Sequence, residues 1–246
     1  MDILSALYEY FFSYTGMGAL GLILCIGVSM FICYKWDLQP IRFLFLYIFS
    51  ILFVYLGAKL FGILSLSAFK QQTGIPLKLS EDIKNAGIVY YGGLIAYLIY
   101  MRTVLPVFYK SKARRVYNCA ALLIPLFHGF ARIGCYFAHC CYGIESSLRV
   151  FSHFYEHRVP VQLMESCFEL ILFLVLGFLL LRKMLSRTTV ARVYLYSYSA
   201  FRFLIEFLRG DTIRGFIGPL SFSQWISVGI LIYLLFTHFK KGEASL

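Results

Sequence analysis

Charged side chains are scarce in this chain of 246 residues. Only 14% of the residues are Asp, Glu, Lys or Arg, and 60% are hydrophobic. A soluble domain usually carries about 25% charged residues. The deficit argues against a soluble protein, and the mean hydropathy of +0.76 points the same way. We therefore expect an integral membrane protein.

Other features are also missing. Residues 1–14 contain no Lys or Arg and no evident cleavage site, so we expect no cleaved signal peptide. The seven cysteines do not make a disulfide framework. Cys25, Cys33, Cys119 and Cys167 fall within or at the ends of apolar segments, where cysteine acts as a small hydrophobe. No compact basic module with aromatic readers is present, so no nucleic-acid partner is expected.

Long apolar windows are what the sequence has in abundance. A helix needs about 20 apolar residues to cross the hydrocarbon core of a bilayer. The pattern predicts an all-α bundle in a single polytopic membrane domain over residues 1–246, with no separate soluble domain. We expect seven spans, near 17–34, 43–66, 86–101, 117–141, 161–181, 193–208 and 221–238.

The loop charges predict an orientation. One set of alternate loops holds 13 Lys and Arg residues and two acids, whereas the other set holds seven of each. Basic residues concentrate in cytoplasmic loops. We therefore expect the N-terminus outside and the C-terminus inside. The formal net charge of +11 is then a signal of topology, with some attraction to anionic lipid.

Six acidic or basic residues remain inside the expected spans, and their formal charges cancel. They are Lys59, Arg132, Glu165, Glu169, Arg202 and Glu206. A charge at bilayer depth costs several kcal/mol unless it is paired or faces a polar cavity. Two interpretations stay open: a functional polar site, or buried ion pairs that fix helix packing.

Two helical stripes collect these groups. Arg202, Glu206 and Arg209 are spaced i, i+4, i+7 and share one face if the segment is a helix. His128, Arg132, Cys135 and His139 form a second stripe, at i, i+4, i+7 and i+11.

The cysteines after Arg132 raise two further hypotheses. Cys135, His139, Cys140 and Cys141 are residue types that bind metals, but adjacent cysteines on a helix point in different directions. We therefore expect no metal ion. A thiol nucleophile with His139 as its base lacks a third group in the sequence to orient the pair. A thiol-redox protein that uses Cys140 and Cys141 is a more distant alternative.

The third span opens with Tyr91-Gly92-Gly93-Leu94-Ile95. The two glycines allow a helix or a lipid to approach the backbone closely. Tyr91 is either an interfacial aromatic residue or a phenol presented to that approach.

These segments together resemble the prolipoprotein diacylglyceryl transferase family. Five or six blocks follow the family's order over most of the chain. They are Leu56–Leu60 with Lys59 for the family's arginine, Tyr91–Ile95, Arg132–Gly143, Pro160–Glu165, Phe201–Arg209 and Ser223–Ser227. Each block alone is a weak signal, whereas the ordered set is specific.

The resemblance implies an enzyme of the bacterial cell membrane with its active site toward the outer leaflet. Such an enzyme moves the diacylglyceryl group of phosphatidylglycerol to the cysteine thiol of a preprolipoprotein lipobox peptide, and it releases glycerol phosphate. It needs no cofactor and no metal, and its other partner is membrane lipid.

Residue roles follow from the same resemblance. The implied catalytic set is Arg202, Glu206, Tyr91 and His139. The implied substrate-binding set is Arg132, Arg209, Gly92, Gly93, Gln162, Glu165 and Cys135. Arg132 and Arg202 would hold the phosphate, for which a bidentate guanidinium is well suited.

The chain departs from the family pattern at the polar positions. Tyr91 replaces a histidine, Cys135 and Ala138 replace asparagines, and Cys140 replaces a glutamate. His139 takes a glycine position beside them and is an alternative base. These departures keep two rivals open: a divergent paralogue with another acceptor, and a non-catalytic phospholipid-binding membrane protein.

Overall fold

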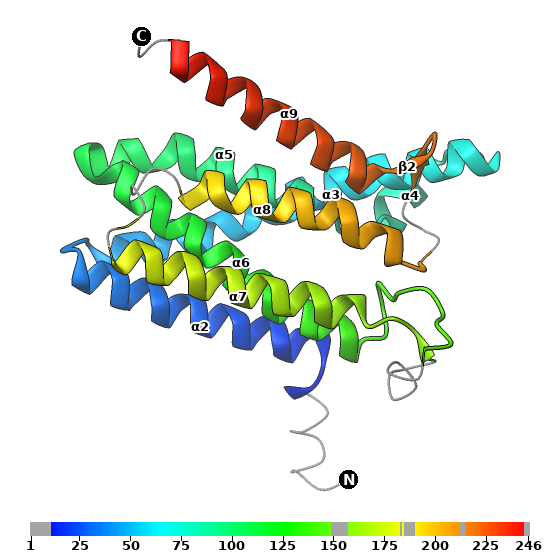
Figure 1. Cartoon of the computed structure of the whole chain (residues 1–246), viewed down its shortest axis with the longest axis horizontal. Helices are drawn as coiled ribbons and strands as arrows, with labels where there is room; N and C mark the ends of the chain where they lie inside the picture. Colours follow the sequence, from blue (N-terminus) through cyan, green and yellow to red (C-terminus); the bar gives the residue numbers. More distant parts are fainter. Residues whose placement is uncertain (1–10, 149–156, 183, 185–189, 212–214, 244–246) are drawn as a thin grey trace, which may run out of the picture. The chain divides into compact units, whose positions relative to one another are not determined.

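The computed structural model describes residues 11–148, 157–182, 184, 190–211 and 215–243, and these are mainly helical (Figure 1). The elements are α2 (Tyr14–Lys35), α3 (Pro40–Thr73), α4 (Leu79–Asn85), α5 (Tyr90–Tyr109), η1 (Lys110–Lys112), α6 (Ala113–Phe137), α7 (Val161–Leu181), α8 (Val190–Ile205), η4 (Glu206–Leu208), β1 (Phe216–Ile217), β2 (Leu220–Ser221) and α9 (Phe222–Glu243). The two strands form an antiparallel hairpin in which Phe216 pairs with Ser221.

Each of the seven expected spans falls on one long helix: α2, α3, α5, α6, α7, α8 or α9. In the described part of the chain, four helical runs are long and apolar enough to cross a membrane. These are Tyr14–Lys35, Pro40–Thr73, Tyr90–Phe137 (which joins α5 to α6) and Val161–Leu181. The helical membrane fold is thus confirmed, whereas the seven crossings and the orientation stay predictions. Seven of the loop charges behind the orientation lie outside the described residues: Asp2, Glu9, Arg149, Glu156, Lys183, Arg187 and Arg214.

Local signals set the helix boundaries. The Ser13 hydroxyl caps α2 by accepting a hydrogen bond from the Gly16 amide at 3.1 Å. Pro40 begins α3, where its fixed φ suits a first helical position. Lys110 ends α5 with a φ of 43°, so the apolar run from Tyr90 turns before α6 begins.

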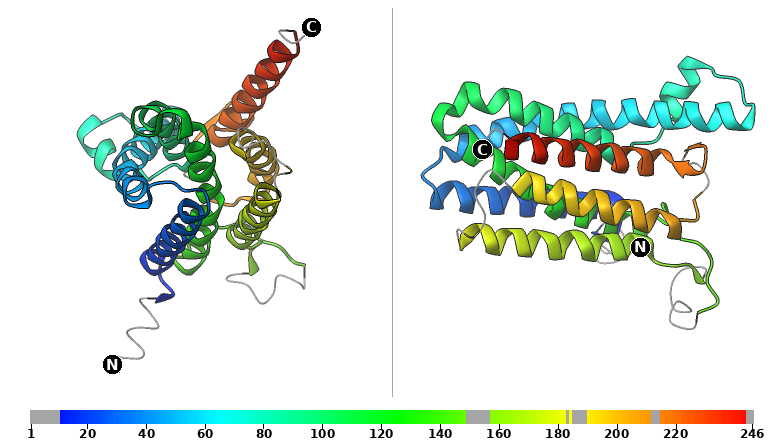
Figure 2. Two further views of the ribbon diagram at one scale, coloured as in Figure 1. Left: turned by 90° about the vertical axis from the view of Figure 1, so that its left-hand side faces the viewer. Right: turned by 45° about the horizontal axis from the view of Figure 1, so that its top comes forward.

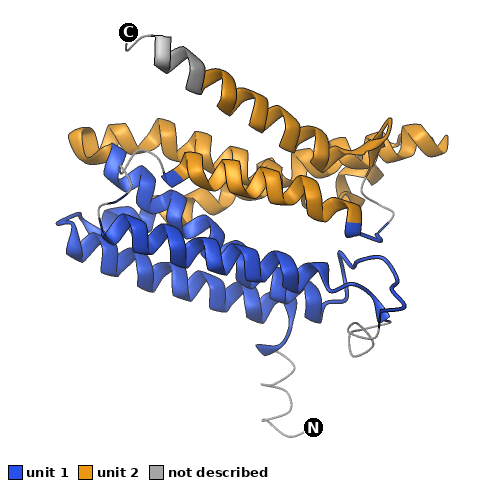
Figure 3. Cartoon of the chain, viewed as in Figure 1, with its two compact units in different colours: residues 1–45, 114–190, 208–211 blue, residues 46–113, 191–207, 212–246 orange. Residues whose placement is uncertain are grey.

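The described chain groups into two compact units (Figure 3). Unit 1 comprises residues 1–45, 114–190 and 208–211, and it contains α2, α7 and nearly all of α6. Unit 2 comprises residues 46–113, 191–207 and 212–246, and it contains most of α3, with α5, α8 and α9. The single polytopic domain expected from the sequence remains a prediction.

In unit 1, α6 lies between α2 and α7, as the left view of Figure 2 shows. Small residues allow this close packing. A Cβ at Gly21 of α2 would come within 2.9 Å of Phe130 on α6, and one at Gly129 of α6 would come within 2.8 Å of Leu170 on α7. Glycine therefore lets both neighbours approach the central helix closely.

In unit 2, α5 is the helix that contacts the others. Gly92 of α5 lies against the carbonyl oxygen of Gly57 and the side chain of Phe61 on α3. On its other sides, Tyr91 bonds to Ser227 of α9 and packs edge-on against Tyr198 of α8, with ring centroids 5.5 Å apart. This packing places the start of α5 inside unit 2.

Many large apolar side chains lie on the outside of the helices. Phe45 on α3 is 72% exposed and Leu174 on α7 is 65% exposed. Extended apolar surfaces of this kind are rare on soluble proteins and suit contact with lipid. The charged side chains Arg132, Glu165, Arg202, Glu206 and Arg209 are buried instead.

Candidate functional site

A buried ion pair joins α6 to α7 in unit 1. The Arg132 side chain is 10% exposed and the Glu165 side chain is 1% exposed. Nε of Arg132 donates to Oε2 of Glu165 at 2.7 Å, and Nη2 donates to the same oxygen. Two donors on one carboxylate oxygen fix the guanidinium plane as well as its charge. Two of the six acidic or basic residues of the expected spans thus neutralise each other.

A second buried pair lies one helical turn away. Nδ1 of His128 is 2.7 Å from Oε1 of Glu169, and Nε2 of His128 is 4.0 Å from Oε1 of Glu165. His128 and Arg132 are spaced i, i+4 on α6, and Glu165 and Glu169 are spaced i, i+4 on α7. The two pairs therefore lie one turn apart along both helices. Sequence reasoning placed His128 on a stripe but did not assign it or Glu169 to the site. The signal was the matching spacing on both helices.

The stripe on α6 does not extend to His139. The helix ends at Phe137, and His139 and Cys141 adopt left-handed φ values of 51° and 56°. This turn corrects the expectation that His139 continues the face of Arg132. The argument against a metal ion also assumed a helix through Cys140 and Cys141, and that geometric premise is wrong. The sulfur atoms of Cys135, Cys140 and Cys141 all lie within 4.8 Å of one another.

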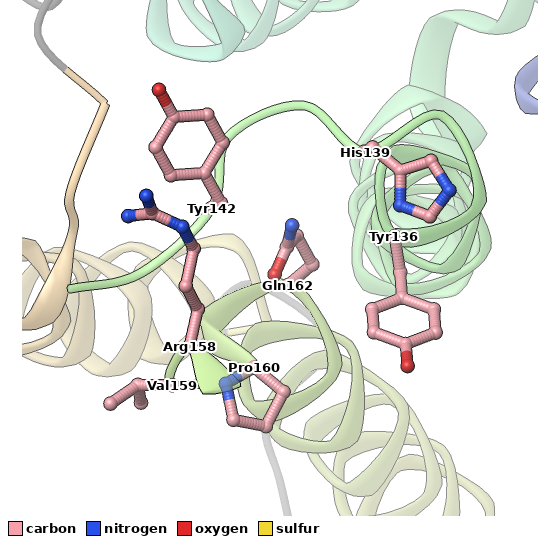
Figure 4. Close-up of a pocket in the computed structure, with 7 residues that line it drawn as sticks. All are labelled: Tyr136, His139, Tyr142, Arg158, Val159, Pro160 and Gln162. Atoms are coloured by element: carbon pink, nitrogen blue, oxygen red, sulfur yellow. The ribbon is translucent and has the colours of Figure 1, made fainter. Parts of the chain in front are cut away.

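Gln162 fixes the turn after α6. Its Nε2 donates to the carbonyl oxygen of Cys140 at 2.8 Å. A small pocket of about 20 Å³ opens beside it, which is room for one water molecule. Figure 4 shows the side chains that line the pocket: Tyr136, His139, Tyr142, Arg158, Val159, Pro160 and Gln162. The Arg158 guanidinium stacks over Tyr142 at 4.6 Å from the ring centroid.

Arg209 does not share a helical face with Arg202 and Glu206. The α-helix ends at Ile205, η4 follows, and Arg209 then pairs with Gly143 in an antiparallel bridge of unit 1. Its Nε and Nη2 donate to the Asp211 carboxylate at 2.8 and 2.6 Å. Burial opposes the charge on Arg209, but the Asp211 hydrogen bonds raise its pKa above the usual value. The stripe expected from the i, i+7 spacing is therefore wrong at Arg209.

Unit 2 holds the pair formed by Arg202 and Glu206. Nη2 of Arg202, near the end of α8, lies 2.6 Å from Oε2 of Glu206, the first residue of η4. The two side chains are 6% and 2% exposed. The polar end of α8 is held against α9 by Gln224, whose Nε2 donates to the carbonyl oxygen of Phe203 at 3.3 Å. The expected i, i+4 pair is confirmed.

Tyr91 is buried in unit 2, with 1% of its surface exposed. Its hydroxyl lies 2.6 Å from Oγ of Ser227. Tyr91 therefore faces the interior of unit 2 rather than its surface. Gly92 and Gly93 face α3, which agrees with close helix approach at these glycines. Whether a lipid chain also approaches there is untested.

Comparisons with known proteins identify the family. The sequence model of one family, prolipoprotein diacylglyceryl transferase, matches residues 9–239. The chain belongs to this family. The phosphatidylglycerol–prolipoprotein diacylglyceryl transferase of Clostridium tetani (strain Massachusetts / E88) is 33% identical over 175 residues, which cover 65% of this chain and 66% of that protein. The phosphatidylglycerol–prolipoprotein diacylglyceryl transferase 2 of Clostridium perfringens (strain 13 / Type A) is 34% identical over 191 residues, which cover 72% of this chain and 70% of that protein.

Within the family, this chain distributes its expected site residues over both units. Unit 1 brings together Arg132, Glu165, Cys135 and Gln162 around the end of α6, and Arg209 is bridged to Gly143 in the loop that follows. Unit 2 holds Arg202, Glu206 and Tyr91 with the two glycines.

Proposed function

We propose that this protein transfers the diacylglyceryl group of phosphatidylglycerol to the lipobox cysteine thiol of preprolipoproteins. The thiol sulfur forms a thioether with the glyceryl carbon, the carbon–oxygen bond to phosphate breaks, and glycerol phosphate leaves. The thiol proton is lost in the same step. Both rivals, a changed acceptor and a binding-only protein, are less favoured because relatives over most of the chain carry the transferase description.

One observation supports the proposal most directly. The chain keeps two buried arginine–carboxylate pairs, Arg132 with Glu165 and Arg202 with Glu206, in a family whose description is a diacylglyceryl transferase. Placing a charged side chain inside a membrane protein costs free energy, so such residues usually mark a functional site. The departing phosphate is the anion that such guanidinium groups would bind.

We assign the roles accordingly. Arg132 and Arg202 bind the phosphate of the lipid and stabilise the charge that develops on it, in a site of low dielectric constant. Glu165 and Glu206 hold those two guanidinium groups in position. Arg209 and Gln162 contribute polar contacts near the head group, and Cys135 takes a substrate-binding position that is an asparagine in the family pattern.

The transfer also needs a base for the thiol proton. A thiol must lose its proton before it attacks, because the thiolate is the nucleophile. Tyr91 and His139 are the two candidates, and they lie in different units. We favour Tyr91 because its buried hydroxyl already has a hydrogen-bonded partner in Ser227. An acid–base residue is more effective when its neighbours fix its orientation.

The location of the reaction is also part of the proposal. Apolar helices place the protein in a membrane, and we infer the bacterial cell membrane from the family. The surplus of basic residues in one set of loops supports a cytoplasmic C-terminus. With seven crossings, the acceptor peptide would then reach the site from the outer leaflet.

The test is a transfer assay in nanodiscs. Purified protein, phosphatidylglycerol and a synthetic lipobox peptide are combined, and mass spectrometry looks for a diacylglyceryl thioether on the peptide cysteine. We expect product from the wild type and almost none from Arg202→Ala. Arg192→Ala on the same helix is the matched control, because Arg192 is more exposed and lies outside the proposed site.

Two outcomes would contradict the proposal. The first is no product while phosphatidylglycerol still binds and an established transferase is active in the same assay, which would favour another acceptor or a binding-only role. The second is an Arg202→Ala variant that works as well as Arg192→Ala, which would remove Arg202 from the phosphate site.

A further inference from the structure

Three thiols converge at the end of α6, although helical spacing had argued against a shared metal site there. Cys135 lies in the last turn of the helix, and Cys140 and Cys141 lie in the turn that follows it. The left-handed φ of His139 reverses the chain, and the left-handed φ of Cys141 turns it again. All three sulfur atoms consequently lie within 4.8 Å of one another.

This spacing suits a soft metal ion. A zinc–sulfur bond is about 2.3 Å long, so two thiolates on one tetrahedral zinc ion lie roughly 3.8 Å apart. The sulfurs are therefore within about 1 Å of the required spacing, a gap that rotation of the side chains can close. Three thiolates form a donor set that selects zinc over hard cations such as magnesium or calcium.

We propose that Cys135, Cys140 and Cys141 together bind one zinc ion. Binding needs no oxidant or reductant: the thiols are deprotonated, their protons go to solvent, and the metal keeps its charge. Zinc prefers four ligands, so three cysteines leave one coordination position for an exogenous ligand. Sites with such an open position are typical of zinc that takes part in chemistry rather than of purely structural zinc.

The surroundings of the cluster support thiolate ligands. Nη1 of Arg132 points at the Cys135 sulfur from 3.7 Å, so a positive charge lies beside this ligand. The Cys140 amide donates to the Cys135 carbonyl oxygen at 3.1 Å, and Gln162 donates to the Cys140 carbonyl oxygen at 2.8 Å. These bonds hold the turn in place before any ion arrives, as the outer shell of a metal site should.

The cluster is also accessible. Cys135 is buried, but Cys140 and Cys141 are only partly covered. An ion can therefore enter from the side of the turn without unfolding α6. Cys167 on α7 belongs to the same unit, is exposed and lies outside the cluster, so it offers a matched control.

The experiment measures metal content directly and does not depend on transfer activity. Reduced full-length protein in detergent is loaded with zinc, passed over a desalting column and analysed by inductively coupled plasma mass spectrometry. We expect about one zinc ion per wild-type chain, the capacity of one such cysteine site. We expect the same from Cys167→Ser and less than a fifth of that amount from Cys140→Ser with Cys141→Ser.

A second measurement covers variants that fail to fold. Wild-type protein loaded with cobalt should show a thiolate-to-cobalt charge-transfer band, and added zinc should abolish it. Zinc should also protect three cysteines, and not Cys167, from alkylation until a chelator is added. Unchanged zinc content in the double variant, or no metal and no band in the folded wild type, would overturn the proposal.

Discussion

The geometry of Arg132 leads to the sharpest prediction. Its guanidinium reaches one carboxylate oxygen of Glu165 through both Nε and Nη2, and both side chains are buried. Arg132→Lys keeps the charge but offers a point charge in place of a fork. The variant therefore tests orientation separately from charge.

The magnitude follows from the lost bond. A hydrogen bond to a charged group contributes about 1.5–3 kcal/mol. If the guanidinium must keep its orientation in the transition state, kcat/KM should fall roughly 10- to 150-fold. Arg115→Lys on the same helix should change it little, because Arg115 is exposed near the other end of α6.

A double-mutant cycle in the nanodisc assay isolates the pair. Arg132→Lys, Glu165→Gln and the combined variant are compared by kcat/KM, and the melting temperature of each is recorded to detect loss of folding. Because the two residues share their bonds, the combined loss should be smaller than the sum of the single losses by at least about 1 kcal/mol. Additive losses, or Arg132→Lys at wild-type activity, would refute the role of Glu165 in orienting Arg132.

Three further predictions concern other parts of the chain. Tyr91→Phe should lower kcat about 100-fold or more if the phenol is the base. Ser227→Ala removes the hydroxyl 2.6 Å from that phenol and should lower kcat less. Equal losses of kcat in the two variants would mean that Tyr91 has a structural role. Gly92→Ala should lower the free energy of unfolding of unit 2 by about 1–3 kcal/mol in denaturant, because the new Cβ would collide with Gly57 and Phe61. Gly229→Ala is the control, because a Cβ there meets nothing within 4 Å. A Gly92→Ala variant as stable as the wild type would contradict this packing. The hydrogen bond from Lys70 lowers the pKa of Asp82. The protection of α4 from hydrogen exchange should therefore be full above pH about 4 and fall as the pH drops through the lowered pKa. Asp82→Asn should abolish this pH dependence.

The helices could be predicted from sequence because apolar length is a direct physical requirement of the bilayer. Each of the seven expected segments overlaps one of the helices α2, α3, α5, α6, α7, α8 and α9, although several bounds differ, by up to eight residues at the end of α5. The balance of acids and bases inside the spans predicted that buried charges could be paired, and the i, i+4 spacing predicted a shared face for Arg202 and Glu206, which form a pair. The choice of Glu165 as the partner of Arg132 was not predicted. Burial of apolar surface in lipid and neutralisation of buried charge are both large free-energy terms. Each leaves a pattern of residue types that can be recognised in the sequence.

The helix ends could not be predicted in the same way. The run from Cys135 to Cys141 is apolar enough to continue a helix, and neither Gly nor Pro marks the stop after Phe137. His139 and Cys141 take left-handed φ values. Few residues other than glycine adopt them, and although histidine does so more often than most, one such residue does not mark a helix end. No residue type marked the change from α8 to η4 at Glu206 either. This change moves Arg209 off the helical face of Arg202 and Glu206.

The thiol cluster and the Arg132 pair share one small region of unit 1, so their ligands should influence each other. With neutral thiols, Arg132 and Glu165 together carry no net charge, whereas three thiolates with one zinc ion add a charge of −1 beside them. If Arg132 binds the lipid phosphate as proposed, zinc should therefore weaken phosphatidylglycerol binding, and the lipid should weaken zinc binding by the same factor, because linkage is reciprocal. Titrating lipid into zinc-loaded and zinc-free wild type measures the factor, with Cys140→Ser and Cys141→Ser combined as the control in which zinc has no effect. Tighter lipid binding in the presence of zinc would refute this electrostatic argument and would instead suggest that the open coordination position takes a phosphate oxygen.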